Sequence, residues 1–347
     1  MEYLLLEECC DILDSMRVPI TASDRKTGLY PYYGANGIQD HVENYIFDDE
    51  LVLLAEDGGN FGSKTKPIAY RVSGKCWVNN HAHVLKPKAN IDVDYLCYSL
   101  MFYNTEELVN GATRQKLTQA AMRKMRIPQY TIQEQEIIVS KLSKVQAIIS
   151  ARQQQLKKLD ELVKARFVEL FGDYRINEKG FDCKKGSELF KFSSGKFLPE
   201  EKRLDEGVPV YGGNGIAWYT SECLVDYPTI IIGRVGAQCG NIHAVTTPVW
   251  ITDNAIYIKE QRKKAYTLEF LTELMRMMDF YQYADFSGQP KITQKPLETL
   301  DYIMPPIELQ NQFAAFVKQT EKSKVVVQKA LDEAQTLFDS LMQKYFG

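Results

Sequence analysis

The sequence predicts an α+β protein with two mixed α/β domains and two long helices, arranged as a pseudo-two-fold internal repeat. Along two stretches, apolar residues recur at alternating spacings of four and three. Both stretches end in Phe-Gly, at Phe171-Gly172 and Phe346-Gly347, so their ends lie 175 residues apart. Two helices in one register, each closing half of the chain, indicate a duplication.

The first long helix is predicted over residues 131–172. Thr131 and Glu134 match a capping box at its start, and Gly172 after Phe171 can end it. About 38 helical residues at ~1.5 Å each span roughly 57 Å. The heptad spacing indicates pairing with another helix, as in a coiled coil. The seam residues are Ile138, Leu142, Val145, Ile149, Leu156, Leu159, Val163 and Leu170.

The second long helix is predicted over residues 305–347, in the same register. Charged residues interrupt the two seams at Arg152, Arg166 and Lys324, where they either fix the register of pairing or extend to solvent. Each helix follows a proline-containing strand exit and carries an early glutamine, at Gln135 and Gln310. The seam residues of the second helix are Phe313, Val317, Thr320, Val327, Leu331, Ala334, Phe338, Leu341 and Tyr345.

Composition limits the class of protein. The 347 residues are 45% hydrophobic and 25% charged, which is typical of globular domains. Seven scattered cysteines without a Cys-x-x-Cys pair favour a reduced, cytoplasmic protein without a zinc site. We expect no signal peptide and no membrane span, because no run approaches about 20 apolar residues. The net charge of −3 means that any DNA-binding surface must be local or shared with a partner.

Residues 1–130 and 173–304 are predicted to be the two globular domains. In the first we expect a helix at residues 4–13, a buried strand at 51–55 and a helix at 94–108. The second repeats several anchors of the first, although most loops differ. The repeated anchors are Tyr33–Ile38 with Tyr211–Ile216, the strand at 51–54 with that at 229–232, Trp77-Val78 with Trp250-Ile251, the domain helix with residues 267–281, and Thr113–Thr118 with Gly288–Thr293.

This order of a globular domain, a long helix, a second globular domain and a second long helix resembles the specificity subunit of type I restriction-modification systems. The helix end from Leu159 to Gly172 and the segments Pro128–Gln135 and Pro305–Gln310 are similar to features of that family. The resemblance implies that each globular domain is a target-recognition domain that reads half of a split DNA sequence. It also implies that the helices pair as an antiparallel coiled coil, set the spacing, and carry two methyltransferase subunits. Restriction and translocase subunits would complete the complex.

Basic and amide side chains beside turns are the best candidates for contacts with DNA. Arg and Lys can pair with guanine, and Asn and Gln with adenine, whereas many such residues contact only phosphate. The Gly-Asn-Gly turns at Asn36 and Asn214 are more often simple turns than DNA contacts, because Gly and Asn tolerate positive φ. The candidates are Arg25, Lys26, Asn36, Lys64, Lys66, Arg114, Gln115, Lys116, Lys191, Lys196, Arg203, Asn214, Arg234, Gln289 and Lys291.

Catalytic residues, a metal and a cofactor are not expected. The sequence has neither Asn-Pro-Pro-Tyr nor Asp-Pro-Pro-Tyr, and its glycine-rich segments do not match a nucleotide-binding loop. His81 and His83 could chelate a metal but lack a third ligand nearby in sequence. The preferred hypothesis is a non-catalytic DNA-recognition subunit. The alternatives are a coiled-coil interaction scaffold without DNA specificity and a fused DNA-modifying enzyme.

Overall fold

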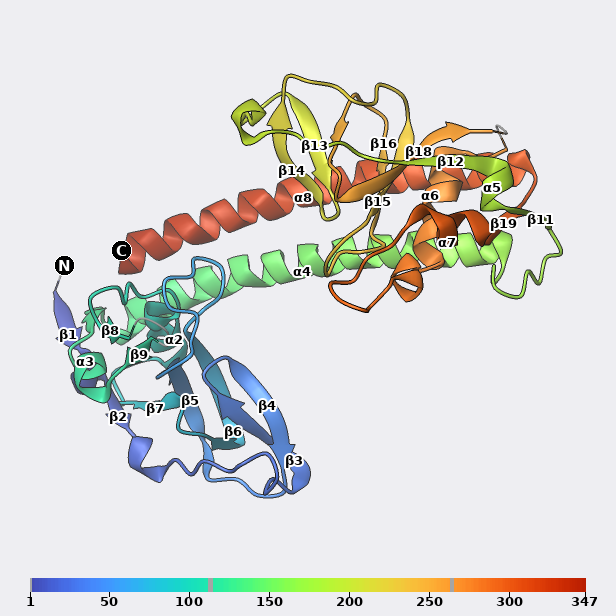
Figure 1. Cartoon of the computed structure of the whole chain (residues 1–347). Helices are drawn as coiled ribbons and strands as arrows, with labels where there is room; N and C mark the ends of the chain where they lie inside the picture. Colours follow the sequence, from blue (N-terminus) through green and yellow to red (C-terminus); the bar gives the residue numbers. More distant parts are fainter. Residues whose placement is uncertain (1, 112–114, 263–264) are drawn as a thin grey trace. The chain divides into compact units, whose positions relative to one another are not determined.

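The structure is a computed structural model that describes residues 2–111, 115–262 and 265–347 (Figure 1). The chain forms two compact units. Unit 1 comprises Met1–Arg152 and Ala330–Gly347, and unit 2 comprises Gln153–Lys329. The two long helices, α4 (Ile132–Phe171) and α8 (Ile307–Phe346), contribute residues to both units.

Unit 1 is built around a six-stranded sheet with the strand order β2-β7-β5-β6-β3-β4. Strand β5 is central, because it pairs antiparallel with both β6 and β7. The elements before α4 are β1 (Tyr3–Leu5), α1 (Leu6–Cys9), β2 (Cys10–Ile12), η1 (Asp14–Met16), β3 (Thr27–Gly34), β4 (Gly37–Val42), β5 (Phe47–Ala55), β6 (Ala69–Val78), β7 (Ala82–Pro87), α2 (Val93–Met101), β8 (Val109–Asn110), β9 (Lys116–Leu117), α3 (Gln119–Arg123) and β10 (Arg126–Pro128).

Unit 2 repeats this plan in two smaller sheets, with the strand orders β12-β18-β15-β16 and β14-β13-β17. Strand β13 pairs parallel with β17, as β3 pairs parallel with β6 in unit 1. The elements are β11 (Asp182–Lys185), α5 (Gly186–Leu189), β12 (Phe190–Ser194), η2 (Glu200–Lys202), β13 (Val208–Gly212), β14 (Gly215–Thr220), β15 (Thr229–Gly233), β16 (Ile242–Val245), β17 (Trp250–Ile251), β18 (Ala255–Gln261), α6 (Leu268–Met277), η3 (Phe280–Tyr283), α7 (Gln294–Thr299) and β19 (Asp301–Met304).

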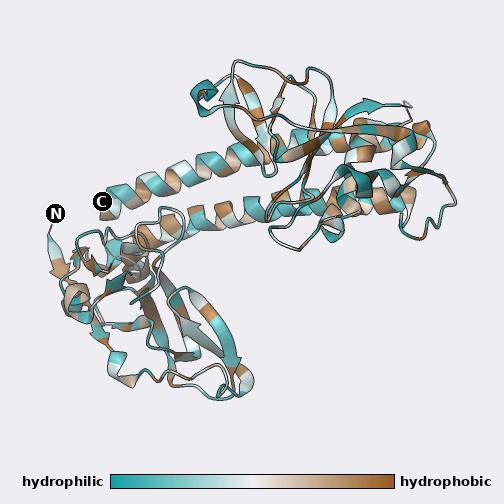
Figure 2. Cartoon of the chain, viewed as in Figure 1, coloured by the Kyte–Doolittle hydropathy of each residue, from teal (hydrophilic) through white to brown (hydrophobic). Residues whose placement is uncertain are grey.

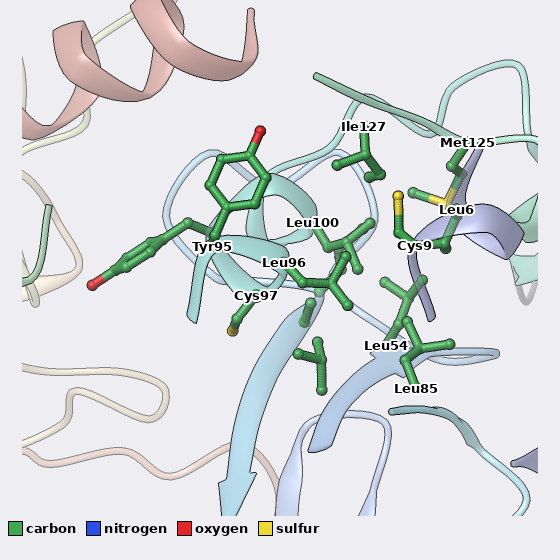
Figure 3. Close-up of a cluster of buried hydrophobic side chains, with 14 of the residues drawn as sticks. Leu6, Cys9, Leu54, Leu85, Tyr95, Leu96, Cys97, Leu100, Met125 and Ile127 are labelled. Carbon is green, nitrogen blue, oxygen red and sulfur yellow. The ribbon is translucent and has the colours of Figure 1, made fainter. Parts of the chain in front are cut away.

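The core of unit 1 lies between the sheet and helix α2 (Figure 3). Leu54 of β5, Leu85 of β7, and Leu96 and Leu100 of α2 are all fully buried. Burial of each such side chain is worth about 1.5–3 kcal/mol relative to exposure. This core fixes α2 on the sheet, and α2 in turn contacts the start of the long helix, where the Tyr98 hydroxyl donates to Gln146 Oε1 at 2.8 Å.

Two helix predictions for unit 1 need correction. Residues 4–13 are not one helix, because Tyr3–Leu5 pairs with β10 and Cys10–Ile12 pairs with β7, leaving only a four-residue helix between them. These tertiary pairings override the local helical pattern. The helix expected at 94–108 occupies Val93–Met101 and is shorter than predicted.

The start of α4 is capped as predicted. The Thr131 amide donates to Glu134 Oε2 at 2.8 Å, and the Glu134 amide donates to Thr131 Oγ1 at 3.4 Å. Gly172, with φ +71°, follows the last helical residue. Brown and teal alternate along α4 and α8 in Figure 2, as amphipathic helices require. No helix of the described residues combines the length and apolar composition needed to cross a bilayer.

Within each unit, one end of α4 shares a core with one end of α8. In unit 1, Ile138 and Leu142 of α4 belong to the same buried cluster as Phe338 and Tyr345 of α8. In unit 2, Phe167 and Phe171 of α4 each contact Phe313 of α8, with ring centroids 5.6 Å apart. In unit 1 the early part of α4 therefore packs against the late part of α8. In unit 2 the late part of α4 packs against the early part of α8.

The charged seam positions make specific contacts in unit 2. Lys324 Nζ lies 2.6 Å from Asp160 Oδ1 of α4 and 2.7 Å from Glu321 Oε1 of its own helix. The guanidinium of Arg166 lies 5.9 Å from the Phe316 ring centroid and pairs with Glu169 at 2.8 Å. Lys324 thus joins the two helices by an ion pair, which favours one register of pairing.

Candidate nucleic-acid interface

In unit 1, three segments that are distant in sequence meet at the hairpin turn between β3 and β4. The Asn36 side-chain amide donates to the carbonyl oxygen of Gly58 at 3.0 Å. The Gly58 amide donates to the Gln115 carbonyl oxygen at 3.4 Å, and the Leu117 amide donates to the Glu56 carbonyl oxygen at 2.7 Å. We call this meeting of residues 34–37, 56–60 and 115–117 turn cluster 1.

Unit 2 builds the same arrangement, turn cluster 2, from residues 212–215, 234–238 and 289–292. The Gly236 amide donates to the Pro290 carbonyl oxygen, and the Ile292 amide donates to the Arg234 carbonyl oxygen, both at 2.9 Å. A Cβ atom on Gly213 would lie 3.7 Å from the Val235 carbonyl oxygen, so the hairpin turn also contacts this loop. The two clusters share a backbone hydrogen-bond pattern although their side chains differ.

The shared hydrogen bonds align Lys116 with Lys291, as the sequence comparison predicts, because Asp57 bridges to Lys116 as Val235 bridges to Lys291. They also align Gln115 with Pro290, so Gln115 and Gln289 are not equivalent. This agrees with the alignment of residues 113–118 with residues 288–293, in which each turn offers a glutamine at a different position. Arg114, which would align with Gln289, lies outside the described residues.

Asn36 has a structural role in turn cluster 1. Besides its bond to Gly58, its Oδ1 accepts a hydrogen bond from Asn60 Nδ2 at 3.1 Å. Gly37 follows with φ +107°, a value that favours glycine. The matching Gly215 has φ +98°, and the neighbouring Asn214 is exposed. Asn36 therefore bonds within the turn cluster although it is exposed, and Asn214 is exposed as well.

An ion-pair network links two segments of turn cluster 1 to Arg17. Glu56 Oε2 lies 2.6 Å from Arg17 Nη1, and Glu56 Oε1 lies 3.0 Å from Lys116 Nζ. Burial alone would raise the pKa of Glu56, but its bonds to Arg17 and Lys116 hold that pKa below its ordinary value. Lys116 is thus half-exposed and already paired with a carboxylate.

The network continues inward to His83, which is 1% exposed. His83 Nδ1 lies 2.6 Å from Asp14 Oδ2, and Nε2 lies 2.9 Å from the Leu117 carbonyl oxygen. Both ring nitrogens therefore lie within hydrogen-bond distance of an oxygen atom. Burial would raise the pKa of Asp14, but the hydrogen bond and charge of His83 outweigh it and lower that pKa.

Asp14, Glu56 and His83 offer three ligand atoms within 4.8 Å of one another. Arg17 and Lys116 already occupy the carboxylate of Glu56, and both nitrogens of His83 have oxygen partners. The cationic neighbours therefore balance the charge of the two carboxylates without a metal ion. His81 and His83, which could have chelated a metal together, have separate partners, because His81 Nδ1 lies 2.6 Å from Asp57 Oδ1.

Turn cluster 2 carries a different charge at the position of Glu56. The shared hydrogen bonds place Arg234 there, and its Nη1 donates to the Asp253 carbonyl oxygen at 3.4 Å. Lys291 is exposed, and among the described residues none forms an ion pair with it within 4.0 Å. Two cations therefore lie in neighbouring segments of cluster 2, where hydrogen bonds and the charge of Lys291 lower the pKa of Asp285. In cluster 1 a carboxylate instead binds the corresponding lysine at 3.0 Å.

The remaining candidates lie outside the backbone contacts that define the clusters. Arg25 stacks on the Tyr32 ring at 4.3 Å and lies 3.5 Å from Asp40 Oδ2. Arg203 stacks on the Trp218 ring at 5.7 Å. Lys26 pairs with the carboxylate of Glu43 at 3.3 Å and is strongly exposed. The other exposed candidates are Lys64 and Lys66 in the loop after β5, Lys191 on β12, Lys196 after β12, and Gln289 in cluster 2.

Comparison with known proteins identifies the family that shares this architecture. Residues 1–161 and 178–334 match the family described as the type I restriction modification DNA specificity domain. A Haemophilus influenzae protein named as a type I restriction enzyme specificity subunit is 37% identical over 150 residues, covering 43% of this chain and 38% of that protein. The EcoprrI specificity subunit of Escherichia coli is 29% identical over 135 residues, covering 38% of this chain and 33% of that protein.

Solved structures share the fold along the whole chain. The crystal structure of the type I restriction-modification S subunit from M. genitalium has a TM-score of 0.68 at 18% identity and covers 100% of this chain and 96% of that one. A chain from a study of type I system assembly and conformational transition has a TM-score of 0.53 at 15% identity, covering 99% and 97%. Because the family match spans most of the sequence, the chain belongs to the type I restriction-modification DNA specificity family.

Proposed function

We propose that this chain is the non-catalytic DNA-recognition subunit of a type I restriction-modification complex. Residues 1–130 and 173–304 act as target-recognition domains, each reading one half of a bipartite sequence. The helices at 131–172 and 305–347 pair as an antiparallel coiled coil and set the spacing. Two methyltransferase subunits dock on the chain, and restriction and translocase subunits join the full complex. The matched curated relatives, which align over about a third of their length, are named as type I restriction enzyme specificity subunits, which supports this proposal.

One observation carries the proposal: two turn clusters with the same backbone hydrogen bonds display different side chains. A shared scaffold with variable surface residues suits two modules that read different half-sites, since base contacts specify sequence whereas the scaffold only positions them. Half-sites about one helical turn apart, ~34 Å, place both readers on one face of the duplex.

The surface of the long helices supports docking of partner subunits. Several apolar side chains on α4 and α8 face away from the seam and are 48–70% exposed. Such residues are suitable for packing against helices of another protein, because burial removes apolar area from water. They are Ile137, Ile148, Leu162, Val325, Val326 and Leu337.

Selection of randomised duplexes by the assembled complex tests the proposal. The methyltransferase subunits with this chain should enrich one sequence in two parts, separated by a fixed number of unspecified base pairs. The methyltransferase subunits without this chain should enrich no such sequence. Enrichment of one continuous short site, or of no site, would contradict bipartite recognition. A complex that assembles but shows no preference for any DNA sequence would favour the interaction-scaffold alternative.

A further inference from the structure

The early glutamines of the two long helices, Gln135 and Gln310, are both buried, with 1% of each side chain exposed. Each is the fourth residue of its helix. A buried amide is costly unless its donors and acceptor find partners. The partners of these two side chains therefore show what each glutamine holds together.

In unit 1, Gln135 bonds to three backbone groups. Its Oε1 accepts a hydrogen bond from the Asp92 amide at 2.8 Å. Its Nε2 donates to the carbonyl oxygens of Asn90 at 3.2 Å and Tyr130 at 2.9 Å. Both amide hydrogens and one acceptor position are used, so this side chain is well matched to its site.

In unit 2, Gln310 makes the same three bonds. Its Oε1 accepts from the Thr267 amide at 2.9 Å, and its Nε2 donates to the carbonyl oxygens of Ala265 at 3.0 Å and Pro305 at 2.9 Å. Every partner lies 175 residues after its counterpart in unit 1. Because Asp92 and Thr267 differ as side chains, what is repeated is the backbone geometry that each glutamine binds.

The three bonds join three separate segments. Asp92 and Thr267 are the N-cap residues of α2 and α6, and each cap side chain accepts a hydrogen bond from a first-turn amide of its helix. Tyr130 and Pro305 end the strand exits that lead into the long helices. Each glutamine therefore ties the start of the domain helix and the strand exit to the first turn of the long helix.

We propose that Gln135 and Gln310 are positioning residues that fix the orientation of each recognition domain on its long helix, and thereby the spacer of the bipartite target. This inference rests on the proposed function. The hydrogen-bond partners of each glutamine belong to neither the seam nor a turn cluster, so the glutamine acts through the angle between domain and helix. The early glutamine of each half is thus a component of spacing control.

A spacer changed by one base pair rotates the distant half-site by about 34° and shifts it by ~3.4 Å. A domain held by three backbone bonds cannot follow this change, whereas a domain released from them can. Loss of the glutamine should therefore broaden the range of tolerated spacers. Which bases each half-site prefers should stay the same, because the turn clusters are untouched.

The test uses Gln135→Leu and Gln310→Leu in the assembled complex, with Gln146→Ala as the matched control. Gln146 is also a glutamine of α4 that contacts α2, but it is exposed, and within the described part of the chain its side chain bonds only the Tyr98 hydroxyl. We expect the ratio of affinities for the preferred spacer and for one base pair more to fall by about tenfold, the scale of a single mismatch. An unchanged ratio in a folded Gln135→Leu or Gln310→Leu complex would overturn the inference.

Gln135→Glu separates the hydrogen bonds from general destabilisation. An ionised carboxylate faces the two carbonyl oxygens unfavourably, whereas a protonated one can donate to one of them while accepting from Asp92. Burial among acceptors raises the pKa of such a carboxyl, so the sharp spacer preference should return at about pH 5.5 relative to about pH 8. A pH-independent profile like that of the Leu variant would count against the hydrogen-bond mechanism.

Hydrogen exchange of the free chain reports on the glutamine without DNA. The Asp92 and Thr267 amides should exchange slowly in the parent chain, and only Asp92 should become faster in Gln135→Leu. If the parent complex shows no spacer preference at all, the proposed function fails, although the exchange result can still hold. If the spacer preference exists but survives loss of the protection at Asp92, only the positioning role fails.

Discussion

Lys116 and Lys291 should contribute unequally to DNA affinity although they occupy equivalent positions. Each phosphate contact contributes about 0.9 to the slope of log affinity against log salt. Lys291 can make such a contact directly. Lys116 must first leave Glu56, whose Oε1 lies 3.0 Å from its Nζ. We therefore expect Lys291→Ala to lower the slope by about 0.9 and Lys116→Ala to lower it by clearly less.

The size of the effect follows from the salt range. Between 50 and 200 mM salt, a slope change of about 0.9 alters the affinity ratio about 3.5-fold. Glu56→Gln should release Lys116 from its ion pair and steepen the slope. Arg17, at 2.6 Å from the same carboxylate, is released as well, so this variant sets an upper limit for Lys116 alone.

The assay is a set of binding curves for the assembled complex at several salt concentrations, on matched and single-mismatch duplexes. Lys185→Ala is the control, because Lys185 is a paired surface lysine on β11, 2.7 Å from Asp301 Oδ2, and is not a candidate for contact with DNA. Equal slope losses in Lys116→Ala and Lys291→Ala would refute the role given to Glu56. Unchanged slopes in both variants would show that the two turn clusters do not contact the DNA phosphates.

Three further predictions concern stability, catalysis and spacing. Asp14→Asn should destabilise unit 1 at pH 7. The folded-state pKa of Asp14 lies below its unfolded value of about 3.9. The difference in the free energy of unfolding between variant and parent should therefore shrink as the pH falls below about 4. Unfolding curves across pH measure it, and a difference independent of pH would exclude the ion pair as its cause. The isolated chain should transfer no methyl group from labelled S-adenosylmethionine to DNA; clear transfer without a partner would identify an enzyme. Inserting one heptad in each long helix adds ~10.5 Å, so the preferred spacer should widen by about three base pairs, as DNA selection can show. An unaltered spacer in an active complex would mean that helix length does not set it.

Local patterns predicted the repeated elements well. The seam and capping box of the first long helix gave residues 131–172, and the structure has Ile132–Phe171. The pairs Trp77-Val78 and Trp250-Ile251 were expected to be equivalent, and both pair parallel with the strand that precedes the hairpin turn. Such elements depend on neighbouring residues, so a single sequence reveals them.

Long-range partners were not predictable in the same way. His83 contacts Asp14 across 69 residues, and Arg17 contacts Glu56 across 39. Neither charge pattern is periodic, so no local signal marks the network that holds Lys116.

Sequencing of methylated sites in a host tests modular bipartite recognition most directly. The host would express this chain with its cognate methyltransferase, once intact and once with residues 1–130 replaced by a foreign recognition domain. The intact chain should direct methylation to one bipartite sequence, and the exchange should change one half-site while leaving the other and the spacer unchanged. Simultaneous change of both half-sites, or methylation of a continuous site, would contradict the proposed function.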